Sequence, residues 1–452
     1  MLEGQTPPEQ IDDPDYAAKP HGDSSSAATP ANGANQRVGF PPWLLVSASL
    51  IVLGGLGYYF WSRSGPAHHD RTQVVDSGSL EELRGVAEKG DASAQLELGD
   101  RYAAIPNNGP EAAKWYRMAS EQGLAKAQVK LGWVYARGTG IPKDPVEAAK
   151  WFRKAAEQGY ASAQYSLGVM YLKGDGVTKD PAEAVKWFRK AAAQGDASAQ
   201  FNLGWAYATG DGVNSDPAEA VNWYRKAAEQ GDTEAQNRLG LIYAGGTGVS
   251  KDPVQAVKWF RKAAEGGNPS AQFNLGAAYA AGDGVAKDLP EAMKWFRKAA
   301  DGGDTSAQFN LGAAYASGDG VPKDLAESVK LFAKAAQGGD AEAQIKLGLC
   351  YASGTGVPED AEMAVRCFLK AAGQNDAKAQ YLVGLCFAEG RGVPKSNVES
   401  LAWLEISASA GDSSAIESRD LLEHQLAPND VLAAKRRSKE LLKKIEMSRA
   451  VN

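Results

Sequence analysis

Histidine is scarce in this chain of 452 residues. The four histidines are His21, His68, His69 and His424, and all of them lie outside the repeating region described below. Histidine is the commonest general base and the commonest metal ligand in proteins, so the repeats lack the side chain on which most catalytic and metal sites depend. Ser-x-x-Lys is also absent, which argues against a serine β-lactamase or penicillin-binding mechanism. The sequence therefore predicts no enzyme, no metal or other cofactor, and no small-molecule substrate.

The chain also has few cysteines and no excess of basic residues. Cys350, Cys367 and Cys386 are the only cysteines, too few to staple the chain, and we expect them to be small buried hydrophobic residues. The net charge is -6 and the sequence pI is about 5.5. An acidic chain offers no electrostatic surface for the phosphate backbone, so we expect no nucleic-acid partner.

What the sequence does have is a repeat of 36 residues. A marker that ends in Ala-Gln, most often as Ala-x-Ala-Gln, recurs with this spacing, and its glutamines are Gln128, Gln164, Gln200, Gln236, Gln272, Gln308, Gln344 and Gln380. A fixed period between 20 and 50 residues is typical of a solenoid, in which each unit buries its apolar face only against its neighbours.

Residues 161–196 show how one unit is built. Small and apolar residues at spacings of three and four predict a first helix, which the glycine at 174 ends. Asp180-Pro181 predicts the start of a second helix, because Asp accepts the free amide protons of a helix start and Pro fits its first position. Gly195 predicts its end, where the left-handed backbone favours glycine. Asn375 replaces this glycine in one unit, and Asn is the next best residue there.

Each predicted first helix also has a glycine in its middle, which is Gly168 in residues 161–196. Glycine inside a helix costs roughly 1 kcal/mol of stability relative to alanine. We expect this cost to be offset because a second-helix aromatic side chain needs a neighbouring backbone without a Cβ. We assign that role to the second-helix tryptophan, which Leu331 and Cys367 replace in two units and which is otherwise Trp115, Trp151, Trp187, Trp223, Trp259, Trp295 and Trp403.

The pattern A-x-A-Q-x-x-L-G-x-x-Y-x-x-G-x-G-V-x-x-D-x-x-x-A-x-x-W-x-x-K-A-A-x-x-G resembles the Sel1-like repeat, a relative of the tetratricopeptide repeat. The resemblance implies an all-α fold, a right-handed superhelix of about nine helix pairs over residues 80–412. It further implies a protein-binding scaffold of the kind found in signalling, envelope and quality-control complexes. The first unit lacks the G-x-G-V loop and is three residues shorter. Residues 413–452 are expected to form capping helices, because a terminal unit needs a polar outer face.

The N-terminal part divides into three segments. Residues 1–41 are rich in Pro, Gly, Ser and acidic residues, and we expect disorder there. Residues 42–61 include 19 uncharged residues bounded by Trp43 and Trp61, which predicts one transmembrane helix, with a cleaved signal peptide as the alternative. Residues 62–79 are expected to be a linker. By resemblance to bacterial signal-anchored proteins of this kind, we expect an inner-membrane protein with its repeats on the periplasmic side.

The first helices supply the candidate binding residues. By analogy with tetratricopeptide arrays, they line the concave side of the superhelix, and two positions of each helix should project into it. The position after the helix glycine gives Trp133, Val169, Trp205 and Leu241, which we expect to contact a partner. The position three before it gives Tyr165, Phe201, Phe273 and Phe309, which are also groove candidates, but for this series we favour the alternative of packing in the core against the preceding unit.

Two functional hypotheses remain open at this stage. The first is a membrane-anchored scaffold or regulator that binds a protein partner in the groove. The second is a structural component of the cell envelope that binds peptidoglycan or an export and assembly complex. The basic C-terminal segment, which includes Lys435, Arg436, Lys439 and Lys443, is interpreted as a polar capping helix, with contact to anionic lipid or an acidic partner as the alternative.

Overall fold

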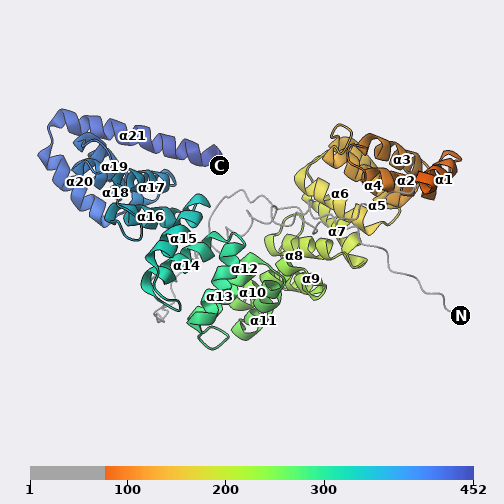
Figure 1. The fold of residues 1–452 in the computed structure, drawn as a ribbon, viewed down its shortest axis with the longest axis horizontal. Helices are drawn as coiled ribbons and strands as arrows, with labels where there is room; N and C mark the ends of the chain where they lie inside the picture. The colour runs from red at the N-terminus through yellow and green to blue at the C-terminus, as the bar shows by residue number, and fades with distance from the viewer. Residues whose placement is uncertain (1–76, 452) are drawn as a thin grey trace. The chain divides into compact units, whose positions relative to one another are not determined.

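The computed structural model describes residues 77–451, and all the regular elements in that range are α-helices (Figure 1). The expected tail 1–41, the expected membrane helix 42–61 and nearly all of the expected linker lie outside the described residues. Among the helices of residues 77–451, none combines the length and the apolar character needed to cross a membrane.

The described chain divides into two compact units after Gly266. The helices of the first unit are α1 Ser77–Glu88, α2 Ala92–Ala103, α3 Gly109–Glu121, α4 Ala125–Arg137, α5 Pro145–Glu157, α6 Ala161–Lys173, α7 Pro181–Ala193, α8 Ala197–Thr209, α9 Pro217–Glu229, α10 Thr233–Gly245 and α11 Pro253–Glu265. Those of the second unit are α12 Pro269–Ala281, α13 Leu289–Asp301, α14 Thr305–Ser317, α15 Leu325–Gln337, α16 Ala341–Ser353, α17 Ala361–Gly373, α18 Ala377–Glu389, α19 Asn397–Ser409, α20 Ser413–Gln425 and α21 Pro428–Val451. From α2 to α19, even-numbered helices are the first of each pair and odd-numbered helices the second.

The helix boundaries confirm the expected start and stop residues. Asp180 accepts a hydrogen bond from the backbone N of Glu183 at 3.0 Å, and Pro181 is the first residue of α7. This cap satisfies one amide group that has no partner inside the helix. After α7, Gly195 has a φ of 92°, and Asn375 has a φ of 69° at the equivalent place after α17. The turn between repeats therefore needs the left-handed backbone, as the residue choice indicated.

The glycine inside the first helix does face an aromatic ring, but not the one expected. A Cβ on Gly168 would lie 2.7 Å from Cε1 of Phe188, the residue that follows Trp187. The same contact with a Phe or Tyr recurs in the other repeats up to α17, and Leu404 replaces the ring opposite Gly384 in the last pair. The assignment of this role to the tryptophans was wrong, because neighbouring residues of a helix point about 100° apart and only one can face the partner helix.

The tryptophans instead connect consecutive repeats. Trp187 of α7 is 7% exposed and lies in a cluster with Phe152, Ala155 and Ala156 of α5, a cluster built mainly from the preceding pair. Lys190 covers the outer side of the indole, with Nζ 4.0 Å from the ring centroid. The Phe therefore holds the two helices of one pair together, while the Trp holds a pair against the one before it.

Buried glutamines add a polar link between repeats. Gln164 donates to the carbonyl O of Ala156 in the preceding repeat at 3.1 Å, and its own Oε1 accepts from Gln194 at 2.8 Å. Buried polar groups are costly unless they are paired, so this chain of bonds specifies the register of the stack. Equivalent bonds join Gln122 to Gln95, Gln158 to Gln128, Gln230 to Gln200 and Gln374 to Gln344.

The stack begins with an extra helix. α1 starts at Ser77, inside the segment expected to be linker, and Ala87 is fully buried against Leu98 and Tyr116 of the first pair. The following repeat has the shortened loop that the sequence indicated. α1 therefore covers apolar surface that a preceding repeat would otherwise cover.

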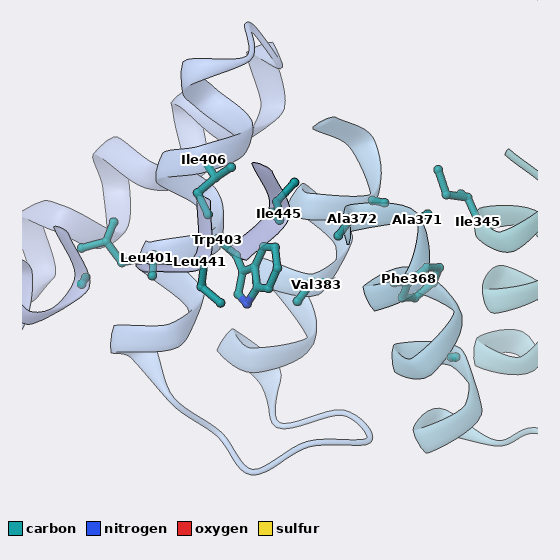
Figure 2. Packing of buried hydrophobic residues seen from close by; sticks show 14 residues of the cluster. Ile345, Phe368, Ala371, Ala372, Val383, Leu401, Trp403, Ile406, Leu441 and Ile445 are labelled. Carbon is teal, nitrogen blue, oxygen red and sulfur yellow. The ribbon is translucent and has the colours of Figure 1, made fainter. Parts of the chain in front are cut away.

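The last helix closes the other end. α20 occupies the place of a first helix, but Asp420 stands where the helix glycine would be. A side chain there leaves no room for the usual ring, and α21 packs on α19 instead. Ala434, Leu441 and Ile445 of α21 are buried in the same cluster as Trp403 (Figure 2). This contact confirms that the C-terminal helices cover the end of the array.

Exchanging glycine for alanine should have opposite effects at two helical positions. Gly168→Ala should lower the free energy of unfolding by about 1–2 kcal/mol, because the strain of overpacking against Phe188 exceeds the helix-propensity gain. Gly85→Ala in α1 should raise it by about 0.5–1 kcal/mol, because nothing lies within 4 Å of the new Cβ. Urea denaturation of both variants measures the difference, and stabilisation by Gly168→Ala would contradict the packing described here.

Candidate partner-binding face

The partly exposed side of the first helices in the first unit is the candidate binding surface. It carries Trp133 on α4, Tyr165 on α6, Phe201 and Trp205 on α8, and Leu241 on α10, and all five side chains are half-buried. We call these five residues the first-helix face. Their helices are held from behind by the Phe and Gln contacts described above, so the face is carried by a rigid scaffold.

Three other candidate residues are buried. Val169 is fully buried in a cluster with Phe188 and Leu203. Phe273 and Phe309 are 5% and 7% exposed, and their rings lie 5.4 Å and 5.6 Å from those of second-helix phenylalanines. All three side chains pack inside the repeats, and for Val169 this corrects the expectation of contact with a partner. For Phe273 and Phe309, the alternative of packing in the core is the one that the structure favours.

Trp133 is fixed from two sides. Its indole packs edge-on against Phe152, with ring centroids 5.1 Å apart and an interplanar angle of 72°. The guanidinium carbon of Arg137, one turn further along α4, lies 5.1 Å from the indole centroid. Burial lowers the pKa of Arg137, so this cation stands in a partly desolvated setting beside the ring. A cation over an indole face is a favourable electrostatic contact.

Trp205 has a similar arrangement that spans two repeats. The guanidinium carbon of Arg238 on α10 lies 5.4 Å from the centroid of Trp205 on α8. Glu234, one turn before Arg238, forms an ion pair with it at 3.2 Å, and the Arg238 side chain is 18% exposed. Trp205 is thus held in place by the following repeat, so ordering this side chain costs little when a ligand binds.

Tyr165 lies between these tryptophans in the chain and carries a polar group on the face. Burial raises the pKa of its phenol, and the nearby carboxylates of Asp196 and Asp232 act in the same direction. Hydrogen bonds with Asn202 and Ser198 of the next repeat act in the opposite direction. Burial also raises the pKa of Asp232 to about 6, although the amide of Ala235 bonds to the carboxylate. The face therefore combines aromatic surface with a small set of oriented polar groups.

The sequence reasoning missed the two arginines that hold the tryptophans. Arg137 ends α4, and Arg238 occupies a position that carries Asn202 in α8 and Ser166 in α6. The available signal was that residue type varies at these two positions from repeat to repeat, with Lys130, Ser166, Asn202 and Arg238 at one of them, so neither position belongs to the shared packing.

The described residues show no arrangement suited to metal binding. Within residues 77–451, no group of three or more His, Cys, Asp or Glu side chains could hold a metal ion. The thiols of Cys350, Cys367 and Cys386 are free, and burial raises the pKa of each. Cys367 is buried and the other two are half-buried, so the expectation of buried hydrophobic residues is met fully only at Cys367.

Comparison with known proteins matches the repeats. A family model described as Sel1 repeat matches nine consecutive segments over residues 92–412: 92–124, 125–160, 161–196, 197–232, 233–268, 269–304, 305–340, 341–376 and 377–412. These segments cover well over half of the chain and begin after α1. Among curated proteins, the comparison finds no match.

Two solved structures illustrate the similarity. A Sel1 repeat protein from Oxalobacter formigenes is 38% identical, with a TM-score of 0.56, and the match covers 68% of this chain and 90% of that one. A protective antigen of uropathogenic Escherichia coli that displays an SLR fold is 32% identical, with a TM-score of 0.47 and coverage of 81% and 95%.

Proposed function

The chain belongs to the Sel1 repeat family, and from this premise we propose that it is a non-enzymatic scaffold that binds a protein partner on the first-helix face. Proteins built from this repeat are generally non-catalytic scaffolds. The observation that carries the proposal is the half-buried Trp205, fixed by Arg238 of the next repeat. Tryptophan and arginine are the residues most enriched at the energetic centres of protein interfaces.

The geometry suits a partner that presents a peptide across successive repeats. Trp133, Tyr165, Trp205 and Leu241 come from four consecutive first helices, so one extended or helical peptide can reach several of them. Apolar side chains of the peptide would contact the two indoles. Carboxylates of the peptide would be attracted to Arg137, which is exposed beside the indole of Trp133.

We further propose that residues 42–61 anchor the chain in the bacterial inner membrane with the repeats on the periplasmic side. The support for an anchor is the uncharged run of 19 residues between Trp43 and Trp61. An anchored scaffold would hold its partner at the membrane surface. Protease protection of intact and permeabilised cells tests the side on which the repeats lie.

The partner proposal is tested by a crosslinking pull-down from intact membranes with the full-length chain. Trp133→Ala with Trp205→Ala should weaken binding of the captured partner about tenfold or more, because truncation of a buried interface tryptophan costs about 1–2 kcal/mol or more. The affinity is then measured with the purified partner. Circular dichroism should show that the helices are retained, since both indoles lie at the surface.

A matched control sits at the same repeat position in the second unit. Leu349→Ala with Leu385→Ala removes two partly exposed apolar side chains from α16 and α18, and it should leave the affinity unchanged. Equal loss in both double variants would argue against a specific role for the first-helix face. Unchanged binding in the tryptophan variant, or capture of isolated peptidoglycan in place of a protein, would overturn the proposal.

A further inference from the structure

We propose that the outer side of α21 docks on an anionic lipid surface. We call this side the outer stripe, and define it by Leu432, Arg436, Lys439, Lys443 and Met447. The proposal goes beyond partner binding and uses no residue of the first-helix face. It concerns a different helix, in the second unit, and can therefore fail or stand independently.

The spacing of these residues places them on one side of the helix. They follow one another at intervals of three or four, which is the spacing of neighbours along one face of an α-helix. Ala434, Leu441 and Ile445 lie on the opposite side, buried against α19 (Figure 2). The packing of α21 on the array therefore fixes which side of the helix faces outward.

Two large apolar side chains on the outer stripe are exposed. Leu432 is 50% exposed and Met447 is 61% exposed, near the two ends of the helix. The cations Arg436, Lys439 and Lys443 lie between them and are also exposed. Binding to a membrane interface draws on buried apolar area and on the attraction of Lys and Arg to anionic lipids, and the outer stripe offers both kinds of side chain.

The cations of the outer stripe differ from their neighbours in pairing. On the flanks of the helix, Lys435 forms an ion pair with Glu423 at 2.6 Å, and Arg437 forms one with Glu399 at 2.8 Å. Arg436, Lys439 and Lys443 form no ion pair with any residue in the described part of the chain. Their charges are available to an external anion, although the chain as a whole carries a net charge of -6.

A lipid surface fits this pattern better than an acidic protein does. The cations alone would suit either partner, but the exposed Leu432 and Met447 at both ends of the cationic segment suit a surface that is apolar below a layer of phosphates. The segment 42–61, which we propose as the anchor, would tether the chain to a bilayer, and tethering raises the effective concentration of the lipid.

The experiment uses the full chain incorporated into lipid nanodiscs, either of phosphatidylcholine alone or of an equal mixture with phosphatidylglycerol. Hydrogen exchange is followed in peptides from α21 only, so that insertion of residues 42–61 does not contribute. We expect exchange in α21 to slow in the anionic nanodiscs alone and to recover at high salt. Arg436→Glu with Lys439→Glu and Lys443→Glu should abolish this protection, at least a tenfold effect for three charges near an anionic surface.

Two variants separate the outer stripe from general charge effects. Lys251→Glu with Lys287→Glu and Lys323→Glu makes the same change in net charge at exposed positions outside α21, and it should keep the protection. Arg436→Gln with Lys439→Gln and Lys443→Gln should lose it without introducing repulsion. The proposal is overturned if neutral nanodiscs protect α21 equally, if the glutamine variant keeps the protection, or if soluble polyglutamate protects α21 as well as the anionic lipid does.

Discussion

Phe188→Ala should lower the free energy of unfolding by about 3–5 kcal/mol, the usual cost of deleting a fully buried ring from a packed core. Phe188 is 2% exposed, and its ring lies against the backbone of Gly168 in the other helix of the pair. It also contacts the ring of Tyr165, with centroids 6.0 Å apart. Since nothing else can fill the space beside a glycine, the truncated side chain would leave a cavity between α6 and α7.

The loss is measured by urea denaturation, with hydrogen exchange to show where the structure opens. Exchange should rise first in α6 and α7, because a repeat protein distributes its stability over neighbouring units. Lys186→Ala is the control one residue from the Trp-Phe pair. Its side chain is exposed and forms only a surface ion pair with Glu183, so the change should cost no more than about 0.5 kcal/mol. A cost below about 1 kcal/mol for Phe188→Ala would mean that the pair is not held by this ring.

The elements that depend on local chemistry could be predicted from the sequence. Asp180 and Pro181 start a helix, and Gly195 ends one, because each of these residues acts on the backbone next to it. Asn375 was expected to take the backbone of the missing glycine, and its positive φ confirms this. The period then repeats one correct unit nine times, which is why the fold of the array followed from a single unit.

The choice between adjacent side chains could not be predicted in the same way. Trp187 and Phe188 are neighbours on one helix, and hydrophobic periodicity does not say which faces the partner helix and which faces the preceding repeat. Only the packing decides, and in the structure the smaller phenyl ring lies against the glycine. The indole of Trp187 lies instead in the cluster formed mainly by the preceding repeat.

The exposure of the side chains at the candidate binding positions could not be predicted from the sequence either. Val169 and Trp205 occupy the same position of consecutive first helices, yet Val169 is fully buried and Trp205 is half-buried. Side-chain size alone does not decide the exposure, because Ala277 and Ala313 at the same position are also half-buried. Arg238 supports Trp205 from the next repeat and could not be placed without the structure.

One long-range signal was present in the sequence. Six first helices begin with Ala, and in five of these repeats the residue that follows the second helix is Gln, in the pairs Ala92 and Gln122, Ala125 and Gln158, Ala161 and Gln194, Ala197 and Gln230, and Ala341 and Gln374; the last repeat has Ala410 there instead. The residue that follows the second helix is Gly where the first helix begins with a larger residue, in the pairs Thr233 and Gly266, Pro269 and Gly302, and Thr305 and Gly338. A larger residue at the first position is matched by glycine at the second, because a Cβ on Gly266 would lie 2.6 Å from Cγ2 of Thr233.

Replacing this glutamine by glycine also removes a hydrogen bond from the repeat. Where Gln follows the second helix, it donates to the buried glutamine of the first helix, as Gln158 does to Gln128 at 2.8 Å. Where Gly replaces it, a buried acceptor can be left over: Oε1 of Gln236 and of Gln308 have no hydrogen-bond partner. The repeats that hold these two glutamines thus lack one bond of the polar chain that links the others.

Restoring the pair should therefore rescue a variant that is harmful alone. Gly266→Gln should lower the free energy of unfolding by about 1–3 kcal/mol, because its side chain collides with Thr233. Adding Thr233→Ala should recover most of this, since the amide introduced at position 266 can then donate to the unpaired Oε1 of Gln236. Urea denaturation of both single variants and the double variant gives the coupling energy, which we expect at about 1–3 kcal/mol.

The same substitution at an open site separates the collision from the loss of glycine itself. Gly373 ends α17 with nothing within 4 Å of its Cβ position, so Gly373→Gln should change the free energy of unfolding by no more than about 0.5 kcal/mol. If the double variant of Thr233 and Gly266 were as unstable as Gly266→Gln alone, the collision between the two side chains would not be what relates the two positions. A full rescue would show that the repeat can be packed in either of two ways. One is a contact between a Thr methyl group and Gly, and the other is a hydrogen bond between two glutamine side chains. The first-helix face would be the same in both.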